Sequence, residues 1–384
     1  MSAINQERGT AKLFIRSMFK KLLFVILVLL VAGGVWYLWG DHSKTALQNK
    51  QIDINNSPKP PVADTKPVNP DSVSALAGLP CADMKRRPVA VMQPADLTAR
   101  PAAGFSDADM VFEMPVITAT INRLMAVYQC ALPKEAGAVR SSRHDFLQLA
   151  KSLNAIYVHW GGSHFALDKI KEGILDNIDC TGAAGNGAGT DVCYRAERVG
   201  TMKLEDTSRV NVQAAFERGK SLGYSTENTF VGYPHQEEAA LESRPTGGRV
   251  RIGYPGAGEV EYLYQKDTNA WKRLWGNTAD TDRNNGKQIA PKNVAVLFAR
   301  SEQIEGQYNN LQLGDPWYDQ TDSGDAYYYV NGKQEKGTWK KDKSSLASKL
   351  YMYDSAGREV RFVPGQIWVN VVEPGTAFEW QPGQ

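Results

Sequence analysis

The longest apolar stretch of the chain lies close to its first residue. Residues 22–39 read LLFVILVLLVAGGVWYLW, eighteen positions without a charge or a proline. At a rise of about 1.5 Å per residue, a helix of this length just spans the roughly 30 Å hydrocarbon core of a bilayer. The pattern therefore predicts one N-terminal transmembrane helix.

Charges on either side of this stretch predict its orientation. Residues 1–21 hold five basic residues against Glu7 alone, and an aromatic cluster from Trp36 to Trp39 marks the other end. The positive-inside rule then places residues 1–21 in the cytoplasm and the C-terminal body outside the cytoplasmic membrane. A cleaved signal peptide is the alternative, because Ala32-Gly33-Gly34 loosely fits a small-residue cleavage site.

Residues 40–79 contain five prolines among Asn, Asp, Ser and Lys and show little apolar periodicity. This composition is typical of a semi-extended linker rather than a folded domain. We therefore expect the folded part to begin near residue 80 and to stand away from the membrane surface.

Strand and helix patterns alternate from residue 80 to 226. Short apolar runs predict strands at Pro88–Met92, Met110–Glu113, Leu124–Tyr128 and Ala155–His159. Helical spacing of Phe146, Leu149, Ala150 and Leu153 predicts a helix over residues 143–153, and a second helix is expected from residue 163 to 170. This order predicts a mixed α/β domain with a β-α-β unit and at least one parallel strand pair.

The pattern becomes β-rich in residues 227–374. Candidate strands lie at Thr229–Tyr233, Arg249–Tyr254, Glu259–Gln265, Asn293–Ala299, Ala326–Val330, Leu350–Tyr353 and Gln366–Val372. Asn331-Gly332 and Ser355-Ala356-Gly357 are typical of hairpin turns. We predict an α+β fold in which this C-terminal domain packs tightly with the first, followed by a tail at residues 375–384.

Composition narrows the function classes. The chain is 42% hydrophobic and 22% charged, which excludes wholesale disorder, and its 384 residues suit about two domains. The net charge of the whole chain is +2. Residues 1–21, the basic tip, carry +4 and residues 22–40 carry no charge, so residues 41–384 carry −2. A slightly acidic body lacks the basic surface that nucleic acid requires. We expect no nucleic-acid partner.

Four cysteines, Cys81, Cys130, Cys180 and Cys193, all lie on the predicted outer side. None has the C-x-x-C spacing of a zinc site, so no metal or cofactor is expected. Cys180 and Cys193 bracket a Gly-rich loop, which favours a disulfide between them and leaves Cys81–Cys130 as the second pair. Four cysteines allow three pairings, and free buried thiols are the alternative.

Short motifs spread over residues 80–374 resemble the YerB-like family. The N-terminal half carries Arg100-Pro101, Ala108-Asp109, Phe112-Glu113, Asn122-Arg123-Leu124-Met125-Ala126, Gly137-Ala138-Val139-Arg140-Ser141-Ser142-Arg143 and Ile156-Tyr157-Val158-His159-Trp160-Gly161-Gly162-Ser163. The C-terminal half adds Asn331-Gly332-Lys333, Gly337-Thr338-Trp339 and Pro364-Gly365-Gln366-Ile367-Trp368. The resemblance implies a bacterial envelope protein with paired N- and C-terminal domains and no settled activity.

The chain differs from that family in two places. Many members look like lipoproteins, whereas here the predicted membrane helix takes the place of the lipid. The family also usually shows a Pro-His-Asn element where this chain reads Met202-Lys203-Leu204-Glu205-Asp206-Thr207-Ser208-Arg209. Any activity of relatives that used this histidine should therefore be missing here.

Candidate chemistry gathers at two segments that each precede a helix, residues 137–144 and 159–163. Unpaired amides at a helix start favour anions, and glycines let the backbone approach a ligand. We expect Ser142 or Ser141 to cap the first helix and Ser163 to cap the second. A β-α-β unit brings both helix starts to one sheet edge. We therefore predict a site for phosphate or carboxylate groups of a cell-envelope component, formed by Arg123, Arg140, Ser141, Ser142, Arg143, His159, Gly161, Gly162 and Ser163.

Three alternatives stay open. Arg140 and Arg143 could instead pair with internal Glu113, Asp107 or Asp109, and His159 could be a core histidine. The protein could be an envelope hydrolase or transferase acting on cell-wall precursors, with His159 as acid–base. It could also be a structural partner of envelope machinery, although the sequence names no protein partner.

The segment Asp280–Gly286 resembles a calcium loop in composition. Its glycine comes one position late, and Pro291 stands where the bidentate glutamate belongs. We therefore expect a turn rather than a calcium site.

Overall fold

The computed structural model describes Asn69 and residues 72–384, apart from residues 118–120, 183–188, 201, 255–257 and 307. Residues 63–384 form one compact unit. The predicted transmembrane helix at residues 22–39, the basic tip and most of the linker lie outside the described residues. Among the residues that are described, none of the helices has the length and apolar character needed to cross a membrane.

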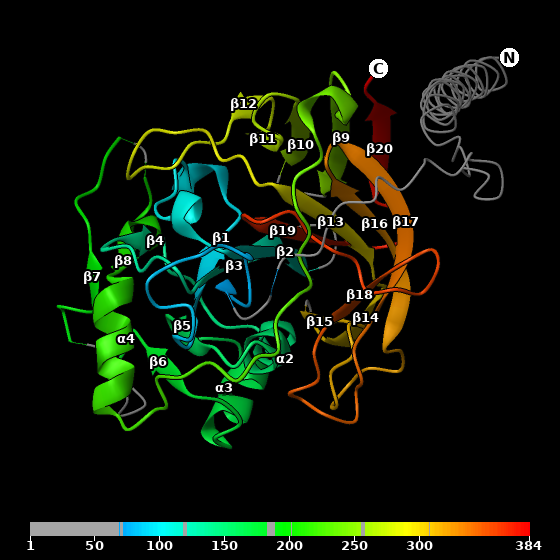
Figure 1. The fold of residues 1–384 in the computed structure, drawn as a ribbon. Helices are drawn as coiled ribbons and strands as arrows, with labels where there is room; N and C mark the ends of the chain where they lie inside the picture. The colour runs from blue at the N-terminus through cyan, green and yellow to red at the C-terminus, as the bar shows by residue number, and fades with distance from the viewer. Residues whose placement is uncertain are drawn as a thin grey trace, which may run out of the picture. The chain divides into compact units, whose positions relative to one another are not determined.

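A ten-stranded mixed sheet runs through both sequence halves (Figure 1). The N-terminal half supplies β1 (Val89–Pro94), β2 (Met110–Ile117), β3 (Ile121–Tyr128), β5 (Ile156–His159) and β6 (Asn177–Asp179). The C-terminal half supplies β13 (Asn293–Phe298), β16 (Ser323–Val330), β17 (Lys333–Lys340), β18 (Tyr351–Asp354) and β19 (Ile367–Val372). Their order is β18-β17-β16-β13-β19-β2-β3-β1-β5-β6.

The two halves meet where β19 pairs in parallel with β2. The register runs from Ile367 opposite Met110 to Asn370 opposite Glu113. Hydrogen bonds of the main sheet therefore cross the boundary between the two halves, which explains the tight coupling expected between them.

The N-terminal half is mixed α/β and the C-terminal half is β-rich, as predicted. Helix α2 (His144–Ser152) precedes β5, and helix α3 (His164–Lys171) connects β5 to the parallel strand β6. This β5-α3-β6 segment is a β-α-β unit. Helix α4 (Val212–Ser221) was not predicted.

A second, five-stranded antiparallel sheet has the order β12-β11-β10-β9-β20. Its strands are β9 (Gly248–Tyr254), β10 (Gly258–Gln265), β11 (Ala270–Trp275), β12 (Thr278–Ala279) and β20 (Ala377–Pro382). Strand β20 pairs with β9, so the segment 375–384, which we expected to be a tail, is largely a strand of this sheet. Its alternating pattern, with Phe378 and Trp380 packing on the core, has the period of a half-buried strand.

Shorter elements complete the chain. Three short strands, β4 (Ala136–Gly137), β7 (Cys193–Arg195) and β8 (Ser208–Val210), form one small sheet, and β14 (Ser301–Glu305) pairs with β15 (Tyr308–Leu311). The 3₁₀ helices are η2 (Leu97–Ala99), η3 (Phe105–Asp107), η4 (Leu204–Thr207) and η5 (Leu241–Ser243). The prediction of a strand at Thr229–Tyr233 is wrong, because these residues form no strand.

Turn chemistry agrees with the sequence at β16–β17. Val330 pairs with Lys333 across a two-residue turn, in which Asn331 and Gly332 have φ values of 53° and 74°. Positive φ at both positions is what a type I′ hairpin needs. At the predicted turn of Asp280–Gly286, the Gly286 amide donates to the Asp282 carbonyl at 2.7 Å.

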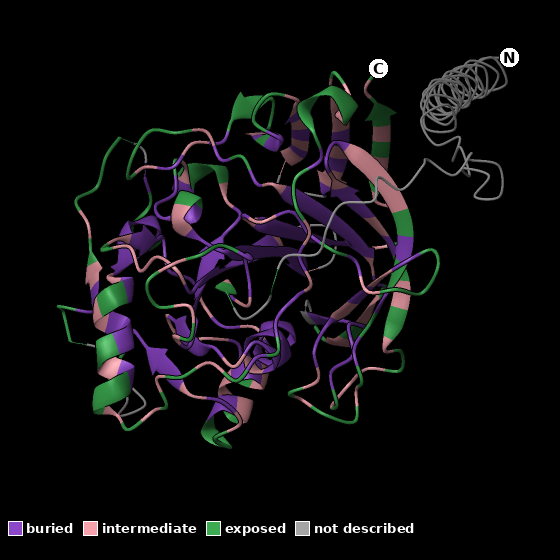
Figure 2. Ribbon diagram, in the orientation of Figure 1, coloured by how far each residue is buried: buried purple, intermediate pink, exposed green. Residues whose placement is uncertain are grey.

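The ten-stranded sheet is covered on both faces, and its central strands are purple in Figure 2. One face, with Val91, Val111 and Trp368, packs with the five-stranded sheet and α4. The other, with Met92, Phe112 and Val369, packs with α2 and α3. Burial on both faces explains why β1 and β19 are mostly apolar, with one polar residue each, rather than alternating between apolar and polar residues.

Two disulfides join the described part, Cys81–Cys130 and Cys180–Cys193. Both pairs are those favoured by the sequence, and there are no free cysteines. The second bridge closes a loop over a sequence separation of 13 residues. A crosslink of this span stabilises the folded state by about 3 kcal/mol in the chain-entropy account.

A fully buried ion network joins the two sheets. The Arg273 guanidinium of β11 donates to Glu113 Oε2 of β2 at 2.7 Å and to Asp280. It lies between the rings of Trp275 and Trp368, at 4.6 and 4.5 Å. Burial acts to lower the pKa of Arg273, but the two carboxylates outweigh it and raise that pKa above its ordinary value.

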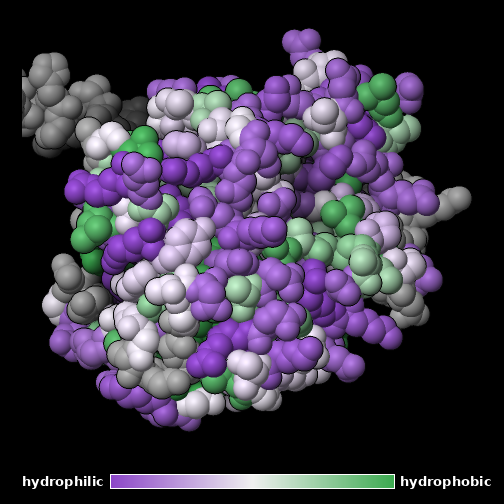
Figure 3. All heavy atoms as spheres, turned by 90° about the vertical axis from the view of Figure 1, so that its left-hand side faces the viewer, coloured by the Kyte–Doolittle hydropathy of each residue, from purple (hydrophilic) through white to green (hydrophobic). Residues whose placement is uncertain are grey.

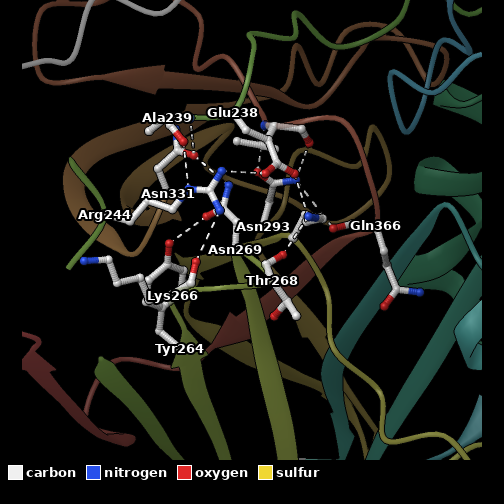
Figure 4. Close-up of polar contacts among 12 residues, drawn as sticks. Glu238, Ala239, Arg244, Tyr264, Lys266, Thr268, Asn269, Asn293, Asn331 and Gln366 are labelled. Carbon is white, nitrogen blue, oxygen red and sulfur yellow. Dashed lines mark hydrogen bonds and ion pairs between the residues drawn. The ribbon is translucent and has the colours of Figure 1, made fainter. Parts of the chain in front are cut away.

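A second polar network ties the connection between the halves to the C-terminal strands (Figure 4). Glu238 accepts from Arg244 at 2.9 Å and from Lys292 at 2.6 Å. Asn331 accepts from the Ala239 amide at 3.1 Å and from Asn269 at 2.8 Å. Both partners of each of these bonds belong to the chain itself. We therefore assign the network a structural role.

Replacing Arg273 with methionine should destabilise the protein by about 3–5 kcal/mol, because Glu113 would be left as a buried carboxylate without its cation. Arg251→Met is the matched control. Arg251 lies in the same sheet, but its side chain is 43% exposed, so its ion pairs should contribute less than about 1 kcal/mol. Urea unfolding of both variants measures the difference, and equal losses would contradict the structural role of the network.

Candidate functional site

The two segments singled out in the sequence lie side by side. The Ser142 amide donates to the Gly161 carbonyl at 2.9 Å, and the Ser163 amide donates to the Ser142 carbonyl at 3.1 Å. The Trp160 amide also donates to the Arg140 carbonyl at 3.0 Å. These three bonds bring residues 140–143 and 160–163 into direct contact.

Both segments lie at the carboxyl ends of parallel strands. β1 and β5 are parallel neighbours, and residues 160–163 directly follow β5. The Arg140 amide donates to the Met92 carbonyl of β1 at 2.8 Å, and Arg123 on β3 pairs with Pro94, the last residue of β1. This edge of a parallel sheet is where ligands commonly bind in α/β proteins.

Three arginines converge there, and we call Arg123, Arg140 and Arg143 the arginine cluster. Arg123 and Arg140 are each only 9% exposed, and Arg143 is partly exposed. Burial lowers the pKa of Arg123 to about 10, and repulsion from Arg143 and Arg140 adds to this effect. The repulsion shows that the three guanidinium groups share one electrostatic environment.

Two carboxylates offset part of this charge. Asp206 of η4 contacts Arg140 Nη2, and Arg140 Nη1 donates to the Glu205 carbonyl. Asp96, which follows β1, lies 3.8 Å from Arg140 and 4.0 Å from Arg123. The three arginines and the two aspartates together carry three positive charges and two negative charges.

The carboxylate partners that we considered in the sequence are wrong. Glu113 pairs with Arg273, and Asp109 accepts the Gln129 and Cys130 amides at 2.5 and 3.0 Å. Asp107 makes no ion pair with an arginine among the described residues. The broader idea of an internally paired Arg140 is correct, but its partner is Asp206.

His159 is a core residue. It is 0% exposed and stacks on Tyr157 with 5.4 Å between ring centroids. Its Nδ1 lies 2.8 Å from the Gly161 carbonyl, and its Nε2 lies 3.3 Å from Asn177 Oδ1. With both ring nitrogens engaged inside the fold, this geometry favours the core interpretation over a role as ligand or acid–base group.

The helix starts are used within the fold. Ser163 caps α3 as predicted, accepting from the Ala166 amide at 3.3 Å. The predicted capping of α2 by Ser141 or Ser142 is wrong. Arg143 occupies the N-cap without a side-chain bond, and Ser142 Oγ bonds Tyr157 at 3.0 Å instead.

The glycine segment is also partnered. The Gly161 amide donates to Asp179 at 3.1 Å, and Thr181 donates to the same carboxylate through its amide and hydroxyl. Burial acts to raise the pKa of Asp179, but these hydrogen bonds outweigh it and lower that pKa. The positive charge of this region therefore lies on the guanidinium groups, and the Gly161 amide is already bonded within the fold.

Sequence reasoning missed Asp96 and Asp206. Asp96 follows β1 and Asp206 lies in η4, and only the fold brings these two distant carboxylates to Arg140. No group of three or more His, Cys, Asp or Glu in the described part of the chain is arranged to hold a metal.

The chain is thus a disulfide-bonded α+β protein whose N- and C-terminal halves share one sheet and whose N-terminal half holds an arginine cluster. Residues 76–229 match the family "Protein of unknown function (DUF3048) N-terminal domain", and residues 250–369 match its C-terminal domain. The chain belongs to this family, which is the YerB-like family indicated by its motifs.

Comparison with individual proteins agrees. A protein of Bacillus subtilis (strain 168) named "Putative lipoprotein YerB" is 28% identical over 293 residues, covering 75% of this chain and 82% of the relative. The crystal structure of YerB protein from Bacillus subtilis matches with a TM-score of 0.65 at 24% identity, over 80% of this chain and 99% of that chain. The two proteins share a fold.

The arginine cluster should lower the stability of the protein when no anion is bound. Replacing Arg123 with methionine removes a buried cation repelled by two others, so we expect the free energy of unfolding to rise by about 1 kcal/mol at pH 7 in a phosphate-free buffer. Urea unfolding measures it. A loss of stability larger than about 1 kcal/mol would instead assign Arg123 a structural ion-pair role.

Proposed function

We propose that this chain is an extracytoplasmic protein held at the bacterial membrane, and that its arginine cluster binds phosphate or carboxylate groups of a cell-envelope component. Candidate sources are envelope lipids, teichoic polymers and peptidoglycan stems. The anion would contact Arg123 and Arg143 beside the Arg140–Asp206 pair, with Ser141 at the rim.

Three observations support the location. The Bacillus subtilis relative is named as a lipoprotein, which concerns attachment to a membrane. Two disulfides are typical of proteins in oxidising compartments. The apolar stretch at residues 22–39 has the length of a single membrane span and follows a basic segment. In this proposal that helix performs the attachment that a lipid performs elsewhere.

One observation carries the ligand proposal, the burial of Arg123 among like charges. Its Nε finds no hydrogen-bond partner among the described residues, although the side chain is about nine-tenths buried. Buried charges are ordinarily paired, and a guanidinium group matches the oxygens of phosphate and carboxylate. Nη1 of Arg123 already donates to the Asn122 carbonyl at 3.0 Å, so an incoming oxyanion would supply the acceptor that Nε lacks and relieve the repulsion from Arg143.

The alternative of an envelope hydrolase or transferase draws no support from His159. Both of its ring nitrogens are bonded inside the fold, and Asp179 beside it is used by backbone and side-chain donors. Binding is therefore the function that the arrangement supports best.

Phosphate should stabilise the full chain, purified in a neutral detergent at pH 7. At a concentration one hundred times the dissociation constant, the gain should be about 2.7 kcal/mol, seen as a higher thermal midpoint. Sodium chloride at matched ionic strength should give a smaller rise, because screening alone does not fill the site. The Arg123→Met and Arg143→Gln variants should lose the phosphate-specific part of the shift.

Arg361→Gln is the control, because Arg361 is an exposed arginine away from the cluster. It should retain the full response. Retention of the response in Arg123→Met, or an equal rise in chloride, would contradict the proposal.

A further inference from the structure

Two large apolar side chains beside the arginine cluster face solvent. Leu97 of η2 is 57% exposed and Leu204 of η4 is 58% exposed, and the two 3₁₀ helices contact each other. Leu79, Val199, Val231 and Leu241 are the other large exposed apolar residues in the described part of the chain.

These leucines are next in sequence to the groups that hold Arg140. Leu97 follows Asp96, whose carboxylate lies 3.8 Å from Arg140 Nη2. Leu204 precedes Glu205, whose carbonyl accepts from Arg140 Nη1. Each exposed leucine is therefore one residue away in sequence from a group that contacts the buried Arg140. The apolar side chains and the buried cation belong to the same small region.

The segment that runs into η4 extends this combination, and we call the described residues of 195–205, which include the first two residues of η4, the basic-apolar loop. Val199 is 59% exposed, and a hydrogen bond of 3.2 Å from the Met202 amide to its carbonyl folds the loop back toward Leu204. Arg195, Arg198 and Lys203 are exposed on the loop. Glu197 and Glu205 are its exposed acids, so the loop carries more positive than negative charge.

Arg195 links the loop to the second segment of the site. Its guanidinium lies 4.8 Å from the ring of Trp160, and its Nη1 donates to the Leu204 carbonyl at 2.7 Å. Trp160 is partly exposed and directly follows β5. The loop is thus held against the edge of the sheet where the arginine cluster lies.

We propose that η2, η4 and the basic-apolar loop dock on anionic phospholipid of the membrane, with a lipid phosphate at the arginine cluster and Leu97, Val199 and Leu204 in the interfacial layer. This deepens the proposed function, on which it rests, by naming the lipid source of the anion. Exposed apolar residues interspersed with Lys and Arg are the composition of surfaces that bind the headgroup region of membranes.

Charge complementarity alone would also suit an anionic wall polymer. Such a polymer would leave Leu97 and Leu204 in water, whereas a phospholipid has apolar chains directly beside its phosphate. Figure 3 views the molecule from the side of β7 and α4, and its hydrophobic residues form small separate groups on a mostly hydrophilic face. Because so little apolar area is available, apolar contact alone would not select a membrane. The contact therefore depends on the negative charge of the lipid.

The predicted linker gives the contact a physical reason to form. Residues 72–79 of the predicted linker belong to the folded body, where Leu76 and Ala77 are buried. The rest of the linker would let the body stand away from the bilayer but would keep the bilayer within reach, and a tethered contact gains from a high effective concentration even when it is weak. Weak docking of this kind would orient the arginine cluster toward the membrane.

The test uses the full chain in nanodiscs of phosphatidylcholine alone or with one part in three of phosphatidylglycerol. Hydrogen exchange of peptides covering residues 95–99 and 195–205 should slow only in the anionic discs. The peptide around Leu241, exposed on η5, should exchange at the same rate in both. In parallel, glycerol phosphate added to the neutral discs should raise the thermal midpoint, which tests the arginine cluster separately.

The double variant L97S/L204S replaces exposed side chains only, so its fold should be intact and its response to glycerol phosphate unchanged. It should lose the protection in anionic discs, while the control L241S should keep it. Absence of protection in the unmodified chain, with the response to glycerol phosphate intact, would overturn the lipid inference and leave the proposed function standing. Absence of both responses would overturn both.

Teichoic acid fragments added to neutral discs provide the competing outcome. Stronger protection of residues 195–205 by these fragments than by phosphatidylglycerol would identify a wall polymer as the partner and overturn the lipid inference.

Discussion

The buried contact between Glu113, Arg273 and Trp368 connects the two sheets and the two halves of the chain. The three residues come from β2, β11 and β19, so one ion pair and one ring contact connect the N-terminal half, the smaller sheet and the strand that continues the main sheet. An ion pair this deeply buried depends on each partner, because a lone charge there would be strongly unfavourable. The parallel pairing of β19 with β2 beside it joins the strands of the two halves into one sheet.

The local elements were largely predictable, and the long-range pairing was not. Continuous apolar runs revealed β1, β3, β5, β13 and β19, and helical spacing revealed α2. Strands β11 and β20 were not predicted, because charged and polar residues interrupt their apolar patterns. The packing role of Trp271 and Trp380 becomes clear only in the fold, where their rings contact each other. Nothing local to residues 110–113 or 367–370 shows that they pair in parallel.

The site divides in the same way. Residues 140–143 and 160–163 meet as predicted, but one β-α-β unit does not hold both helix starts. Helix α3 follows β5 in such a unit, whereas α2 follows β4 of the small sheet and reaches the same edge because the Arg140 amide bonds the Met92 carbonyl of β1. The partners of each side chain did not follow. Whether Ser142 caps a helix or bonds Tyr157, and whether Arg140 meets Glu113 or Asp206, depends on side-chain positions set by the whole fold. The three arginines lie together, with Arg140 paired to Asp206, whereas His159 and Gly161 form hydrogen bonds within the fold.

The most direct test of the anion site is diffraction from crystals of the full chain grown with selenate, a tetrahedral oxyanion whose selenium scatters anomalously. The account predicts an anomalous peak at the arginine cluster, with selenate oxygens within hydrogen-bond distance of Arg123 and Arg143. An empty cluster at saturating selenate, with peaks only at other surface cations, would contradict it.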